Sequence, residues 1–153
     1  MKALLPFAPL LLAAAPQSAP TPTPLPSSID GLPLGAIPRQ DLPAKGCAAY
    51  LWTVSGTRAL VAMAQADPGR LRLSIGGTMT DLDRSAQSGA GGFGFGESND
   101  YGAAGISAKL TMKIETRESI SSGAVVTEGL LQLDRAGQDT VVVPVGGLIG
   151  CAT

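Results

Sequence analysis

The stretch Ile106–Thr116 reads ISAKLTMKIET, and it decides the fold class. Apolar residues alternate strictly with polar ones along it, at positions 106, 108, 110, 112 and 114. A period of two places the apolar side chains on one face of a strand, whereas a helix would scatter them around its circumference. One buried face and one solvated face are typical of antiparallel sheets. The stretch therefore predicts a half-buried antiparallel strand.

Similar short runs fill the chain from residue 45 onward. They are 47–54, 59–66, 71–75, 78–82, 124–133 and 140–145, and turn-forming residues such as Asp67-Pro68-Gly69 and Gly76-Gly77 separate them. The chain is thus predicted to be all-β, a single small antiparallel barrel or sandwich of about eight strands.

The residues of 124–133 and Pro144 give two specific expectations. In 124–133, the period of two groups one set of residues on a single face: Val125, Thr127, Gly129, Leu131 and Leu133. Pro144 has no amide donor, so its strand is expected to lie at an edge or to be bulged there.

Residues 1–19 are typical of a signal peptide. Lys2 supplies a positive charge, and the apolar run 3–15 (ALLPFAPLLLAAA) has the length of a signal-peptide core and is too short to span a bilayer. The prediction is a periplasmic or secreted protein that meets the membrane only through this segment, with an uncleaved N-terminal anchor as the alternative.

Residues 20–44 are rich in proline, and only Pro68 and Pro144 of the 12 prolines lie beyond residue 43. Proline lacks an amide donor and fixes φ, so this composition predicts a disordered, extended tether. A plain spacer is the simpler interpretation, and a docking motif is the alternative. The folded all-β domain is accordingly expected at 45–153.

The chain has 2 cysteines, Cys47 and Cys151, near the two ends of the predicted domain. In an oxidising compartment an even pair predicts a disulfide, which would tie these ends together. The alternative is two buried free thiols.

Charge and composition exclude several classes of function. The 11 Lys and Arg residues balance 12 Asp and Glu, so no basic field for nucleic acid is present. The chain has no histidine, which removes the commonest general base and metal ligand. Asp81 and Asp83 share a strand face and could act as a carboxylate pair. They could also bind Ca²⁺ together with Glu97, Asn99 and Asp100, but solvated strand acids are the simpler interpretation. We expect no enzyme activity and no cofactor.

Residues 88–102 read SGAGGFGFGESNDYG, in which Gly89–Gly94 matches the G-x-G-x-x-G pattern of phosphate-binding loops. Such a loop needs a following helix, whose N-terminus supplies amides to the phosphate. Here Phe93 and Phe95 alternate with glycines, which indicates a strand. No nucleotide site is expected.

The segment 85–101 has two interpretations. Its glycines allow close packing within a sheet, or the segment is a surface loop that contacts a partner. On the second interpretation the candidate contact residues are Ser88, Gly89, Phe93, Phe95, Asn99 and Tyr101.

CAAYLW at 47–52 together with PVGGLIGC at 144–151 resembles a group of small exported bacterial proteins of unassigned function. This resemblance covers both ends of the domain and implies no activity.

A weaker resemblance is to the periplasmic inhibitors of C-type lysozyme, small antiparallel barrels whose S-A-S-G-x-x-Y loop enters the lysozyme cleft. The stretch 85–93 (SAQSGAGGF) departs from that loop by one extra residue, by phenylalanine in place of tyrosine and by the lack of a basic residue. Only Ser88 and Gly89 match.

These observations predict an exported, non-enzymatic β-domain that acts through surface contacts with an envelope or protein partner. The alternative is a periplasmic inhibitor of a lysozyme-type hydrolase, acting through the Ser88 loop.

Overall fold

The structure is a computed structural model that describes residues 18–153, so most of the predicted signal peptide lies outside the described residues. The described chain forms strands, turns and irregular segments without any helix. The strands are β1 (Leu34–Gly35), β2 (Cys47–Thr53), β3 (Leu60–Gln65), β4 (Arg70–Ile75), β5 (Thr78–Ser88), β6 (Ser98–Ala103), β7 (Ile106–Glu115), β8 (Gly123–Arg135) and β9 (Val141–Cys151).

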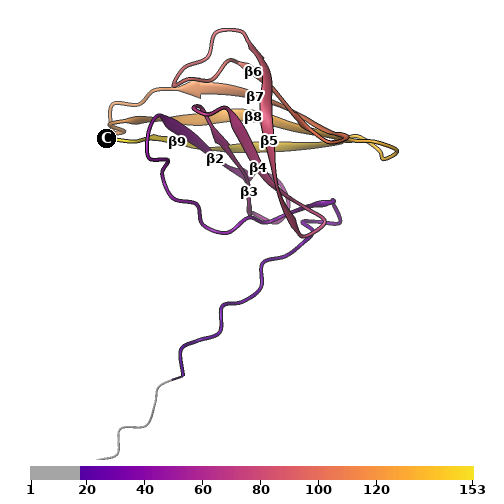
Figure 1. The fold of residues 1–153 in the computed structure, drawn as a ribbon. Coiled ribbons are helices and arrows are strands. Elements are labelled where there is room, and N and C mark those ends of the chain that lie inside the picture. Colours follow the sequence, from indigo (N-terminus) through magenta and orange to yellow (C-terminus); the bar gives the residue numbers. More distant parts are fainter. Residues whose placement is uncertain (1–17) are drawn as a thin grey trace, which may run out of the picture.

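Strands β2 to β9 form a closed antiparallel barrel in which each strand pairs with the next along the chain (Figure 1). The pairing of β9 with β2 closes the ring, and β1 adds to β4 outside it. The all-β prediction is confirmed, and the sheet is a barrel. Loops 66–69, 89–97 and 116–122 lie with both cysteines at one end, the disulfide end, and loops 54–59, 76–77, 104–105 and 136–140 lie at the opposite end.

The seam between β2 and β9 is in register from Cys47 opposite Cys151 to Thr53 opposite Val145. The two cysteines form a disulfide with an S–S distance of 2.06 Å, as the sequence predicted. The bond joins residues 104 positions apart across two paired strands. The disulfide therefore fixes the pairing that closes the barrel.

The barrel interior follows the alternation of β7. Ala108, Leu110 and Met112 are buried, and Lys109 and Lys113 are exposed, as the sequence predicted. The hairpin turn at Gly76-Gly77 is also confirmed, since Ile75 pairs with Thr78 and both glycines have positive φ.

The face predicted for β8 is wrong in its first half. Ala124 and Val126 are buried there, whereas Val125 and Thr127 are not. A β-bulge between Val126 and Gly129 inserts one residue and moves the inward face to the odd positions, so Leu131 and Leu133 are buried as expected.

Pro144 lies in β9 just beyond the last paired residue of β2. Its carbonyl accepts a hydrogen bond from the Val54 N–H (3.3 Å), and Thr53 opposite Val145 is the last pair of the seam. The nitrogen of Pro144 points to the same side of β9 as its carbonyl, beyond the end of β2. The missing N–H therefore removes no hydrogen bond between β9 and β8.

Part of the predicted tether belongs to the domain. Ile29 and Leu34 are buried in the main core, and β1 pairs with the end of β4. The Asp30 carboxylate accepts hydrogen bonds from the N–H and the hydroxyl of Thr57 (2.8 and 2.7 Å). The folded domain thus begins near residue 27 rather than 45, because apolar side chains between the prolines pack on the opposite end of the barrel.

Residues 36–43, here called the strap, cross the outside of the barrel. Ile37 packs with Ala48 and Met63, which point outward from β2 and β3. The Tyr50 hydroxyl donates to the Asp41 carbonyl (2.9 Å). The strap therefore covers part of the outer surface of the sheet.

Replacing both cysteines with alanine is expected to lower the free energy of unfolding by about 3–5 kcal/mol, because the unfolded chain gains the entropy of a long open loop. Urea denaturation monitored by the fluorescence of Trp52 measures the change. Reductant should lower the stability of the natural chain and leave the double variant unchanged.

Gly147→Ala is expected to destabilise the barrel by about 3 kcal/mol, because the new Cβ overlaps the Tyr50 carbonyl oxygen on the adjacent strand. Gly92→Ala is the matched control, since nothing lies within 4 Å of the added atom. Equal stabilities of the two variants would contradict this close contact at the seam.

Candidate functional site

The segment 85–101 is shorter as a loop than the sequence suggested. Strand β5 continues to Ser88 and β6 begins at Ser98, which leaves 89–97 as the connection. Gly92 and Phe95 exchange two backbone hydrogen bonds of 3.0 Å around a turn of Phe93 and Gly94, whose φ angles are 58° and 86°. The strand expected from the alternation of phenylalanine and glycine at 92–96 is therefore wrong, because these residues form a tight β-turn and strand β6 begins only at Ser98.

Three of the six predicted contact residues are buried. The Phe95 side chain lies in the main core, and Tyr101 is 1% exposed. Asn99 is fully buried, and its side-chain amide binds the N–H and carbonyl of Gly96 (3.1 and 2.9 Å). These residues hold the loop against the barrel, which corrects the expectation that they face a partner.

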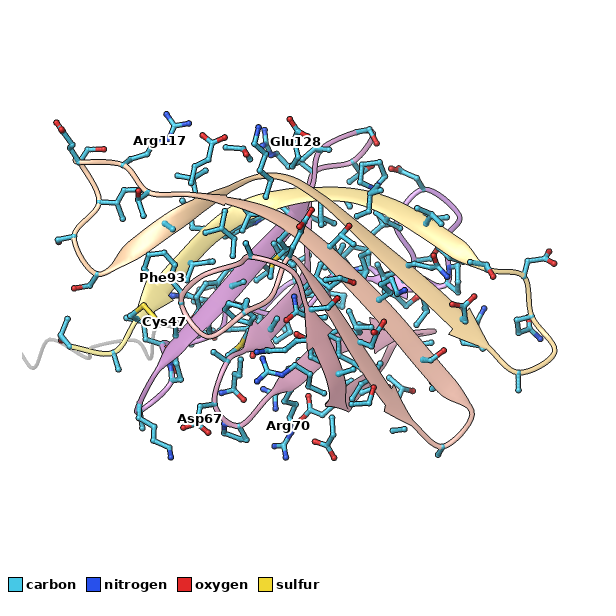
Figure 2. All side chains as sticks on the ribbon, turned by 90° about the horizontal axis from the view of Figure 1, so that it is seen from above. Cys47, Asp67, Arg70, Phe93, Arg117 and Glu128 are labelled. Carbon is cyan, nitrogen blue, oxygen red and sulfur yellow. A yellow bond between two sulfur atoms is a disulfide. The ribbon has the colours of Figure 1, made fainter. Side chains whose placement is uncertain are left out.

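The other three predicted contact residues lie near the surface of the disulfide end. Ser88 and Gly89 are exposed, and Phe93 is half-buried against the core. Figure 2 shows Phe93 at the same end of the barrel as Cys47. The exposed residues of this segment, 85–91 with Gly94 and Glu97, form a rim around Ser88 and Gly89.

Arg84 fastens two loops at the disulfide end. Its guanidinium donates to the carbonyls of Gly94 (3.1 Å) and Ala66 (3.0 Å), one in each loop. Tyr101 lies opposite Arg84 in the β5–β6 ladder, and its buried hydroxyl has no hydrogen-bond partner. Burial raises the pKa of Tyr101 to about 12, and the charge of Arg84 opposes this with a smaller effect.

The acids considered for catalysis are paired with arginines. Arg72 donates two hydrogen bonds to Asp81 (2.8 and 2.9 Å), and these bonds hold the pKa of Asp81 below its usual value. Arg70 lies 3.3 Å from Asp83. Residues 18–153 contain no group of three or more histidine, cysteine or acidic side chains placed to hold a metal ion.

A surface that the sequence interpretation missed lies outside the seam. Strands β2 and β9 contain no charged residue. The apolar side chains that point outward from them and from β8 form the seam face, which consists of Trp52, Val54, Leu130, Val142, Pro144 and Leu148. Four of them are about half exposed: Val54 at 54%, Leu130 at 48%, Val142 at 53% and Leu148 at 48%.

A groove of about 710 Å³ crosses this part of the barrel. Thr111, Leu130 and Pro144 lie side by side on β7, β8 and β9 and line it. Val54, just beyond the end of β2, and Gly91, in the 89–97 loop, also line it. The groove thus connects the apolar seam face with the segment in which a contact site was predicted.

Charge is distributed unevenly around the barrel. Glu128 and Lys113 line the groove, with 3.9 Å between their charged atoms, which is a weak contact at an exposed site. Figure 2 shows Glu128 on the side of the barrel opposite to Asp67 and Arg70. The arginine–aspartate pairs of β4 and β5 therefore lie away from the seam face.

A sequence signal for the seam face was present. Both β2 and β9 are apolar at inward and outward positions, as in CAAYLWT and VVVPVGGLIGC. A closed barrel of this size buries only the inner face of each strand, so a strand that is apolar on both faces must expose one of them or have it covered.

Comparison with known proteins found no matching family model, curated protein or solved structure. Within residues 18–153, no helix of a length and apolarity suited to crossing a bilayer is present.

Tyr101→Phe is expected to change the free energy of unfolding at pH 7 by less than about 1 kcal/mol, because the lost hydroxyl has no partner. In the natural chain folding raises the pKa of Tyr101, because the buried site favours the neutral phenol. This contribution to the free energy of unfolding is complete below pH 10 and is lost as the pH rises toward 12. By pH 11.5 the natural chain should lose about 2 kcal/mol more free energy of unfolding than the variant. Denaturant titrations at pH 7 to 11.5 measure the difference, and parallel curves for both chains would contradict it.

Proposed function

We propose that this protein is an exported, non-enzymatic β-barrel domain that binds a protein or envelope partner through its seam face. The signal-like residues 1–19 and the disulfide both favour a periplasmic or secreted location, since disulfides persist in oxidising compartments. The N-terminal segment is the only contact with the membrane in this proposal.

The observation that carries the proposal is the exposure of the seam face. Four aliphatic side chains that are each about half exposed leave on the order of 350 Å² of apolar surface in one patch, within the size range of interaction sites. The rest of the outer surface is different, because the strap covers part of it and paired charges cover β4 and β5. A binding role explains why β2 and β9 keep apolar residues on their outer face.

Inhibition of a lysozyme-type hydrolase has less support. Such inhibition needs a loop that enters a cleft, whereas loop 89–97 is tied down by Phe95 and Arg84. Ser88 pairs with Ser98 at the end of β5, so it belongs to a paired strand rather than to a projecting loop. The seam face is larger and connects with the groove.

Site-specific photo-crosslinking in cells that export the protein tests this function. A crosslinking amino acid at position 130 or 148 should trap a specific envelope partner, and the same group at position 79 should not. Met79 is a matched control, because it is 45% exposed and lies on β5, across the barrel from β9.

Equal crosslinking from positions 79, 130 and 148, or none from any of them, would overturn the assignment. Stoichiometric loss of lysozyme activity that Ser88→Asp restores would instead place the contact at the Ser88 rim.

A further inference from the structure

The strap is an example, within this structure, of a segment bound to the outer face of β2. It is an extended segment without helix or sheet pairing, and it lies across the outward side chains of β2 and β3. Its apolar contact at Ile37 is supplemented by three hydrogen bonds: the Ile37 N–H donates to the Leu60 carbonyl (2.8 Å), the Tyr50 hydroxyl donates to the Asp41 carbonyl (2.9 Å), and Arg72 donates to the Gln40 side chain (3.1 Å). An extended, proline-flanked segment therefore fits this surface.

The seam face continues from the point where the strap ends. A Cβ on Gly150 would lie 2.7 Å from the Leu42 side chain, so the strap reaches β9 at this residue. The next outward residue along β9 is Leu148, which is 48% exposed. Beyond it, Trp52 lies opposite Gly146, which has no side chain to cover the indole ring. The covered and uncovered surfaces thus form one continuous apolar strip.

The size of the open part limits its occupant. A stable dimer buries about 800 Å² on each partner, which is roughly twice the exposed apolar area here. A single extended segment needs far less area. A second copy of the barrel is therefore a poorer fit than a peptide.

The chemistry of the seam face also limits which class of peptide can bind to it. The seam face carries no charge, and β9 is already paired with β2 from Val145 to Cys151, so a peptide at Leu148 meets side chains rather than a free backbone edge. Proline-rich segments suit such a surface, because they are extended before binding, make no internal hydrogen bonds and pack on aromatic and aliphatic side chains.

We propose that the seam face, from Leu148 past Trp52 to Leu130, binds an extended, uncharged peptide segment rich in proline and aliphatic residues. This inference rests on the proposed function and adds the class of ligand. The chain itself contains a segment of this chemistry at 20–26 (PTPTPLP), and these residues are exposed rather than docked. A synthetic peptide of that sequence, capped at both ends, is therefore the probe.

Binding is measured on the full chain by titration with the capped peptide. Trp52 is the only tryptophan of the protein and belongs to the seam face, opposite Gly146, so its emission should shift to shorter wavelength on binding. We expect a Kd on the order of 100 µM, as suits a short segment on a small surface.

Leu130→Glu and Leu148→Glu should each weaken binding at least tenfold, and Met79→Glu on the opposite side should leave it unchanged. A control peptide with aspartate in place of its leucine should bind at least tenfold more weakly. Far-ultraviolet circular dichroism and denaturation midpoints verify that the three protein variants remain folded.

Absence of binding up to about 5 mM peptide, or affinity that neither glutamate variant changes, would overturn the inference. A monomer–dimer equilibrium that Leu130→Glu abolishes, seen by sedimentation, would show a second copy as the occupant instead. If crosslinks from position 130 persist while the peptide fails to bind, the contact surface stands and the ligand class is wrong.

Discussion

Closure of the sheet between its first and last long strands is the constraint on which the molecule depends. Without the β2–β9 pairing, both strands would expose unpaired backbone N–H and C=O groups along uncharged, apolar edges, which favours aggregation. The disulfide lies at one end of this pairing and Gly147 allows close contact within it. The same closure gives every strand an inside and an outside, and it thereby turns the outer apolar residues of β2, β8 and β9 into a surface.

The two ends of the barrel are closed by segments that the sequence analysis did not assign to the core. At the disulfide end, loop 89–97 folds inward on Phe95 and is held by Arg84 and Asn99. At the opposite end, Ile29 and Leu34 of the N-terminal segment pack into the core. Polar and glycine-rich residues near the predicted contact site thus support the fold.

The sequence predicted what depends on local periodicity and on residue chemistry. The alternation of β7, the Gly76-Gly77 turn and the cysteine pair could be read directly. The β8 bulge could not, because one inserted residue reverses the inward face without a local signal. Asn99 and Tyr101 were misplaced because polar residues beside glycines resemble a surface loop, and only the fold shows that Gly96 needs the Asn99 amide. The start of the domain was missed because prolines dominate the composition around Ile29 and Leu34.

The chain leaves the barrel at the end opposite to its C-terminus, through the exposed residues 18–26 (Figure 1). Nine residues in polyproline conformation span about 28 Å. A molecule held by residues 18–26 therefore turns its disulfide end away from the point of attachment.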